Sequence, residues 1–161
     1  MEFEDQLSSG NSGASATTPT QCSGLKVGGH VMIQSHPCKI ANMVTSKPGK
    51  HGSTKVHIVA FDIFTGKRYE DIAPSSKMLS VPVLKKTEHI VTNVDSEGRI
   101  SVLDSAGGIS GSLEIAPVSQ AKYPDPLAMM EKAFDNDLDL LAQVLEFNGE
   151  GKVIEMRTKA P

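Results

Sequence analysis

Short apolar stretches, separated by Gly, Pro or Asn turn signals, run along most of the chain. The clearest covers residues 54–64, where Val56, Ile58 and Ala60 alternate with polar residues before both faces become apolar. Alternation with a period of two is typical of a half-buried β-strand. Similar patterns predict strands at residues 30–34, 38–45 and 68–72, with a break at His36-Pro37, and an edge strand or extended connector at residues 81–83.

The second half of the chain repeats this pattern and inserts one helix. Residues 126–134 have helical character, with Asp125 placed to cap the helix and Pro126 at its first position. A hairpin loop is expected at residues 95–98 and a turn at 148–151. Strands are predicted at residues 89–94, 99–103, 113–116, 140–147 and 152–158.

The order of these elements predicts an all-β protein of two small barrels. Residues 1–20 are expected to be a flexible N-terminal tail, because the small polar residues from 6 to 20 cannot bury enough apolar area to offset chain entropy. Residues 21–83, short strands without a long helix, predict an SH3-like barrel. Residues 84–161, with strands on both sides of one short helix, have the order of an OB-fold.

Charge is distributed unevenly between the two halves. The whole chain has a net charge of -3, yet no Asp or Glu occurs between Gln6 and Phe61, a stretch that holds five lysines. Residues 1–86 carry a net charge of +4 and residues 87–161 a net charge of -7. This difference favours two domains with the basic one facing an anionic partner, although two unevenly charged solvated surfaces are an equally good interpretation.

Composition excludes several classes of protein. No stretch approaches the roughly 20 consecutive apolar residues of a membrane span. The first residues are acidic where a secretory signal would be basic, which predicts a soluble intracellular protein without membrane contact. Cys22 and Cys38 lack metal-ligand spacing and are expected to be reduced thiols at least partly buried in the protein, so no metal site is predicted.

The segment from Ser46 to Lys55 carries the candidate chemistry. Pro48-Gly49 favours a tight turn, and Gly49 and Gly52 remove side chains on both sides of Lys50. The pattern predicts a hairpin tip that displays Lys50 to an anionic groove such as an RNA backbone. An ordinary solvated basic turn is the alternative. The predicted RNA- or ribosome-binding residues are Ser46, Lys47, Gly49, Lys50, His51, Gly52 and Lys55.

Catalytic patterns are weak throughout. Gly49-Lys50 and Gly66-Lys67 do not fit the phosphate-binding motif GxxxxGK[ST]. His57 and Asp62 lack a nucleophile motif such as GxSxG, so no catalytic residue is predicted and the chain is not expected to be an enzyme. The second half holds few aromatic residues for base stacking, and RNA contact is therefore expected mainly in the first half.

Three motifs in the first half identify a family resemblance. They are SKPGKHG at residues 46–52, KVH at 55–57 and FDIFTGKRYEDI at 61–72. Together they resemble the eukaryotic translation initiation factor 5A family, with a specific match from residue 38 to residue 82. From residue 88 onward the resemblance lies in pattern and element order.

The resemblance implies an SH3-like barrel followed by an OB-fold, with Lys50 converted to hypusine. Deoxyhypusine synthase would transfer an aminobutyl group from spermidine using NAD, and deoxyhypusine hydroxylase would then add a hydroxyl. No cofactor beyond this modification is implied. Members of the family bind the large ribosomal subunit near the tRNA exit site, where the loop reaches toward peptidyl-tRNA.

The function that follows is that of a cytoplasmic translation factor, which eases peptide-bond formation at stalling sequences such as consecutive prolines and aids termination. Its rival is a general RNA-binding module that is never modified. An enzyme that uses the Gly-Lys loop is a third class, but it lacks a partner base.

Overall fold

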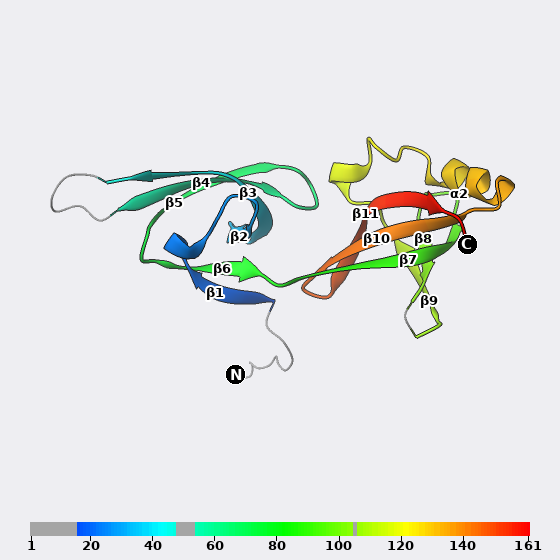
Figure 1. Cartoon of the computed structure of the whole chain (residues 1–161), viewed down its shortest axis with the longest axis horizontal. Coiled ribbons are helices and arrows are strands. Elements are labelled where there is room, and N and C mark those ends of the chain that lie inside the picture. The colour runs from blue at the N-terminus through cyan, green and yellow to red at the C-terminus, as the bar shows by residue number, and fades with distance from the viewer. Residues whose placement is uncertain (1–15, 48–53, 105) are drawn as a thin grey trace. The chain divides into compact units, whose positions relative to one another are not determined.

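The computed structural model describes residues 16–47, 54–104 and 106–161 (Figure 1). These residues belong to two compact units, Met1–Val83 and Leu84–Pro161. The described part of each unit consists mainly of antiparallel strands.

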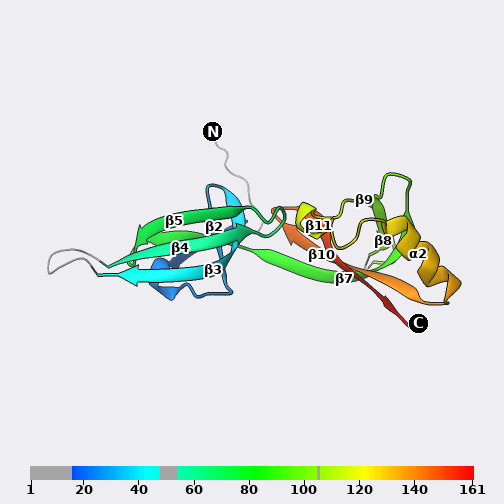
Figure 2. The same ribbon diagram turned by 90° about the horizontal axis from the view of Figure 1, so that it is seen from above.

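The N-terminal unit contains a four-stranded antiparallel sheet in the order β2-β3-β4-β5 and a separate pair, β1-β6. Strands β3, β4 and β5 run side by side (Figure 2). The elements are β1 (Thr17–Gln21), η2 (Cys22–Gly24), β2 (His30–Ile33), β3 (His36–Ser46), β4 (Lys55–Asp62), β5 (Arg68–Pro74) and β6 (Met78–Pro82).

Strand β4 shows why the sequence pattern gives this sheet. Val56, Ile58 and Ala60 are buried, whereas His57 and Phe61 lie on the opposite face, as a period of two requires. The inward side chains join a core that also includes residues of β2, β3, β5, β6 and η2. The expected strand at residues 54–64 is therefore confirmed, apart from its ends.

The break between the first two predicted strands lies earlier than expected. His36 and Pro37 are the first residues of β3, and Pro37 pairs with Met32 of β2. The turn is made instead by Gln34 and Ser35, whose φ angles are 49° and 69°. Proline tolerates this place because it is among the first residues of a strand.

The predicted tail of residues 1–20 is wrong for its last part. Thr17–Gln21 form β1, which pairs with β6 over five positions from Thr17↔Pro82 to Gln21↔Met78. The amide of Val83 also donates to the carbonyl oxygen of Ala16 at 2.8 Å. Because the strand buries little of its own surface, its order comes from main-chain pairing that no local apolar pattern reveals.

The C-terminal unit contains a five-stranded sheet in the order β11-β10-β7-β8-β9. Its largest pairings join β10 to β11 and to β7. The elements are β7 (Leu84–Val94), β8 (Ile100–Leu103), β9 (Ile109–Leu113), η3 (Pro117–Ser119), α2 (Pro126–Asp135), β10 (Asp139–Phe147) and β11 (Glu150–Lys159).

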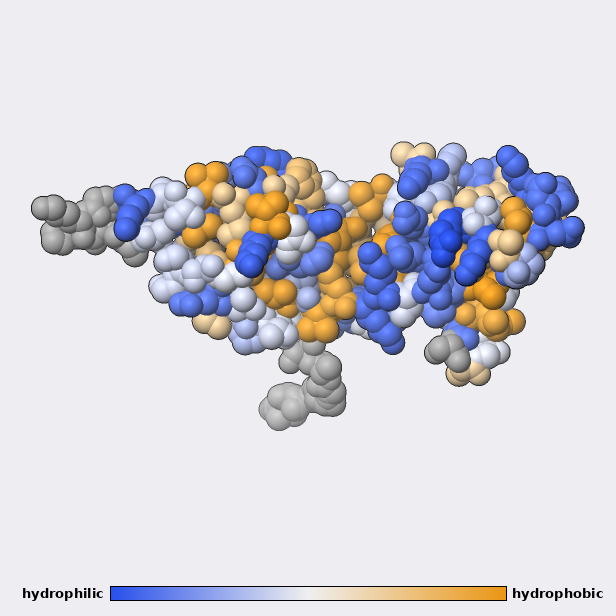
Figure 3. Space-filling view, in the orientation of Figure 1, coloured by the Kyte–Doolittle hydropathy of each residue, from blue (hydrophilic) through white to orange (hydrophobic). Residues whose placement is uncertain are grey.

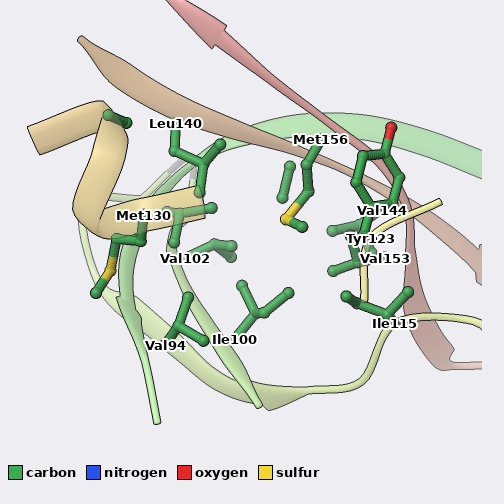
Figure 4. Packing of buried hydrophobic residues seen from close by; sticks show 13 residues of the cluster. Val94, Ile100, Val102, Ile115, Tyr123, Met130, Leu140, Val144, Val153 and Met156 are labelled. Carbon is green, nitrogen blue, oxygen red and sulfur yellow. The ribbon is translucent and has the colours of Figure 1, made fainter. Parts of the chain in front are cut away.

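Helix α2 begins as the sequence predicts. The side chain of Asp125 accepts a hydrogen bond from the amide of Ala128 at 3.0 Å, and Pro126 follows at the first helical position. Met130 and Ala133 on one face of the helix belong to the core of this unit, in which Leu140 and Ile100 are fully or almost fully buried (Figure 4).

The strand expected at residues 113–116 lies earlier, at Ile109–Leu113. Its residues are mostly exposed, because β9 is the last strand of the sheet and pairs only with β8. Ile115, which the apolar pattern placed in that strand, instead forms an isolated parallel bridge with Val153. An edge strand held by main-chain bonds needs no apolar face, and its sequence therefore gave no signal.

The fold class is confirmed: the protein is all-β, with an SH3-like barrel followed by an OB-fold that carries one short helix, α2. Among the residues that the structure describes, no helix has the length and apolar character needed to cross a membrane.

We predict that removal of β1 destabilises the N-terminal unit. A chain that begins at Cys22 should unfold with a free energy lower by on the order of 4 kcal/mol than a chain that begins at Ala16, since β1 pairs with β6 over five positions and each lost ladder hydrogen bond contributes about 1 kcal/mol net. Urea unfolding followed by circular dichroism measures the difference. Equal stability of the two truncated chains would show that β1 is a passive appendage.

Candidate functional site

The predicted tip lies between two strands whose ends face each other. β3 ends at Ser46, β4 begins at Lys55, and these two residues are paired in register. Thr54 then accepts a hydrogen bond at its carbonyl oxygen from the amide of Ser75 at 2.9 Å. The connecting segment is therefore held at both ends by one antiparallel pair.

The candidate residues are only partly described. Ser46, Lys47 and Lys55 are all exposed, and within the described ranges neither lysine takes part in a salt bridge. Gly49, Lys50, His51 and Gly52 lie outside the described residues. The structure thus brings together the base of the predicted tip and places two cationic side chains there.

The strands below the tip are anchored by their buried face. Val56 pairs with Thr45 on one side and Ala73 on the other, and Val56 and Ala73 are almost fully buried. Ile58, two positions farther along β4, is fully buried. This continuous anchoring makes β3 and β4 a rigid stem, because moving either strand would expose core side chains.

The exposed face of the stem carries a three-residue polar network. His57 Nε2 lies 2.8 Å from Glu70 Oε1, and Arg68 Nη1 donates to Glu70 Oε2 at 2.8 Å. The hydrogen bond from His57 and the positive charge of Arg68 lower the pKa of the Glu70 carboxyl group. Glu70 therefore remains ionised and paired, which reduces its repulsion of an anionic partner. Sequence reasoning missed this network, although the register of alternate residues on β4 and β5 could have revealed it.

The structure does not bring His57 and Asp62 together. His57 and Asp62 are five positions apart on one strand and so face opposite sides. Asp62 is buried and accepts hydrogen bonds from the amides of Phe64 and Thr65, at 2.8 Å and 3.0 Å. It also lies 3.1 Å from His36 Nδ1. Asp62 therefore organises the turn after β4.

Both cysteines are buried and free, as expected. Burial, and next the charge of Asp62, raise the pKa of the Cys38 thiol to about 11. Burial is also the main cause of the raised pKa of Cys22. Both therefore stay protonated at neutral pH, and a thiol in that state is a poor nucleophile. In the described part of the chain, no three His, Cys, Asp or Glu side chains gather as metal ligands.

The C-terminal unit has few aromatic rings for stacking. Tyr123 is buried in the core, and Phe147 is half-buried, while Phe134 on α2 is exposed. Several of its cations are already paired: Arg157 donates two hydrogen bonds to Glu88, and Lys152 donates one to Glu114. This pairing leaves the N-terminal unit as the better candidate for contact with a polyanion.

Comparison with known proteins gives a consistent result. The family model described as "Translation initiation factor 5A-like, N-terminal" matches residues 15–77. Eukaryotic translation initiation factor 5A of Spodoptera exigua is 40% identical over 157 residues, covering 97% of this chain and 94% of the relative. Factor 5A-1 of Saccharomyces cerevisiae is 40% identical over 157 residues, covering 98% and 96%.

Solved structures agree with the sequences. A translation initiation factor of the eIF-5A family from Naegleria fowleri superimposes with a TM-score of 0.76 and 35% identity. The match covers 89% of this chain and 99% of the other. Factor 5A from Methanococcus jannaschii gives a TM-score of 0.68 at 25% identity, covering 88% and 96%. The similarity therefore extends over both units.

We predict that the network around Glu70 stabilises the N-terminal unit at neutral pH and not in acid. Because the pKa of Glu70 is lowered in the folded protein, its contribution is present above the unfolded value of about 4.3 and is lost as the pH falls through the folded value. Urea unfolding should therefore show Glu70→Gln less stable than the parent at pH 7, with the difference shrinking below about pH 4.

The matched control is Glu131→Gln, on the exposed side of α2, since Glu131 has no ion pair with any described residue. Its difference from the parent should stay the same at both pH values. A stability difference for Glu70→Gln that persists unchanged in acid would contradict the electrostatic account of the network.

Proposed function

Because this chain belongs to the eukaryotic translation initiation factor 5A family, we propose that it is a ribosome-binding factor acting through a hypusine on Lys50. The observation that carries the proposal is the in-register pair Ser46↔Lys55. It joins the ends of the segment that contains Lys50 to a rigid stem. The family is one of translation factors.

Modification requires that Lys50 enter the active site of another enzyme. In the proposed first step, deoxyhypusine synthase breaks the C–N bond between the aminobutyl group and the secondary amine of spermidine and forms a C–N bond to the Lys50 nitrogen. The leaving group is 1,3-diaminopropane, and NAD carries the hydride between the two halves of the step. Deoxyhypusine hydroxylase would then use molecular oxygen as the oxidant to replace one C–H hydrogen of the new side chain with a hydroxyl. Support comes from the flanking glycines, Gly49 and Gly52, which reduce steric cover beside Lys50. The exposed ends of the segment, Lys47 and Lys55, fit the same requirement.

The proposed action on the ribosome is one of positioning. The lengthened side chain would reach toward the acceptor end of peptidyl-tRNA from a place near the tRNA exit site of the large subunit. A stem anchored by Val56 and Ile58 fixes the two ends of the segment that contains Lys50, and a shift of about 1 Å in reacting groups can cost on the order of a hundredfold in rate. Consecutive prolines would benefit most, because the proline ring restricts φ and hinders alignment of the reacting groups. Help with termination would use the same contact.

Electrostatic attraction supplies the second part of the proposal. Lys47 and Lys55 are unpaired with described acids and lie at the base of the tip, where they can approach RNA phosphates. Their attraction is independent of base sequence, as a factor that meets many tRNAs requires. The work would take place in the cytoplasm, and the chain itself would catalyse no reaction.

Mass spectrometry of protein from its natural source tests the modification. The absence of any Asp or Glu from Gln6 to Ala60 means that cleavage before Asp5 and Asp62 releases one peptide containing Lys50. We predict a spermidine-derived mass increment that fragmentation places on Lys50 and not on the other lysines of that peptide. The same peptide from bacteria that lack both modifying enzymes is the control. Bare Lys50 in native protein would support the unmodified RNA-binding module instead.

Lys50→Arg separates positioning from simple attraction. It keeps the positive charge but removes the amine that the synthase must alkylate. We predict that the variant retains appreciable ribosome binding yet fails to relieve stalling at consecutive prolines in reconstituted translation with both modifying enzymes present.

The matched control is Lys67→Arg, an exposed lysine in the turn between β4 and β5, at the end of β4 opposite to Lys55, which should relieve stalling like the parent. Full activity of Lys50→Arg would overturn the hypusine mechanism and leave charge as the whole explanation.

A further inference from the structure

A row of three exposed side chains crosses the sheet of the N-terminal unit away from the tip. Phe61 on β4 is the direct partner of Lys39 on β3 and of Arg68 on β5. Directly paired residues of neighbouring strands point to the same face, with their Cβ atoms about 5 Å apart. The result is an aromatic ring with a cationic side chain on each side.

Phe61 is not used by the core. The residue is 41% exposed, whereas its neighbours Ala60 and Asp62 on the other face of β4 are buried. Hydrophobic and polar residues are interspersed on the visible surface of this unit (Figure 3). An exposed aromatic residue in a strand whose opposite face already fills the core is free to contact a ligand.

The charge around the ring favours an anionic ligand. Lys39 is exposed and, within the described ranges, takes part in no salt bridge. Arg68 is bonded to Glu70 through Nη1, and its side chain remains 55% exposed. Glu70 in turn is shared with His57, so the acid on this face is already paired on both oxygens.

We propose that Lys39, Phe61 and Arg68 form a binding site for single-stranded RNA, in which Phe61 stacks on a base and the two cations contact neighbouring phosphates. Single-strand binders combine a stacking ring with positive charge along the backbone, and stacking tolerates any base. Phe61 lies six residues from Lys55 along β4, which corresponds to about 20 Å. The site is therefore separate from the tip and needs no modification of Lys50.

Fluorescence anisotropy with a labelled oligoadenylate of about twelve nucleotides tests the site. The full chain with unmodified Lys50 is used, so that the result is independent of hypusine. We expect Phe61→Leu, which keeps an apolar side chain but removes the ring, to weaken binding about five- to hundredfold. Lys39→Gln should reduce the slope of log affinity against log salt by about 0.7, the value for one phosphate contact on a single strand.

Two controls make the result specific. Ile72→Ala changes another exposed apolar residue of the sheet, 63% exposed, and should leave the affinity unchanged. A duplex RNA offers no free base, so Phe61→Leu should bind it as the parent does. Unchanged urea unfolding and amide NMR spectra verify that each variant folds. Folding is expected because the three substituted residues, Lys39, Phe61 and Ile72, are exposed.

If Phe61→Leu and Lys39→Gln both bind the single strand with the affinity of the parent, the proposed RNA site is wrong. The exposed row would then be a candidate surface for a protein partner instead. An equal loss of affinity of Phe61→Leu for single-stranded and for duplex RNA would also overturn the proposal, because it would show that Phe61 does not act by stacking on a base. A loss of translation activity on Lys50→Arg has no bearing on this result.

Discussion

The N-terminal unit depends on one constraint: β4, which lies between β3 and β5 in the sheet, buries one of its faces in the hydrophobic core. Val56, Ile58 and Ala60 fix the register of the strand, because a slip of one residue would turn them all toward solvent.

The same register decides which side chains lie next to one another on the exposed face of the sheet. It sets His57 against Glu70 and places Phe61 between Lys39 and Arg68. One face of β4 therefore stabilises the fold, and the opposite face carries the polar and aromatic side chains that can contact a ligand.

The two units differ in how many of their cationic side chains are paired with acidic ones. In the C-terminal unit, Arg157 and Lys152 are bonded to Glu88 and Glu114, so the acidic excess is partly balanced at the surface. In the N-terminal unit, Lys47 and Lys55 have no such described partner, and Glu70 is occupied by His57 and Arg68. In the described N-terminal unit, a polyanion therefore meets lysines whose neighbouring acids are scarce or already paired.

Sequence reasoning succeeds where local chemistry decides the structure. The alternation in β4 and the capping of α2 by Asp125 both depend on neighbours in the chain, and both are confirmed. It fails where distant pairing decides the structure. Strand β1 is ordered by β6, whose Val81 is 63 residues from its partner Thr18 in the chain, and β9 is an exposed edge strand. The motif around Lys50 identifies the family, but the row at Phe61 emerges only when three strands are placed in register.

Directed radical probing tests most directly our proposal that the segment containing Lys50 approaches the acceptor end of peptidyl-tRNA. Ser46→Cys places an iron chelate at the end of β3, while Cys22 and Cys38 are buried thiols with raised pKa values that react poorly with the label. On ribosomes stalled at consecutive prolines, we predict cleavage of the tRNA acceptor end from this position. A probe at exposed Ser96 in the C-terminal unit is the control. Cleavage of the acceptor end from Ser96→Cys but not from Ser46→Cys would contradict the account.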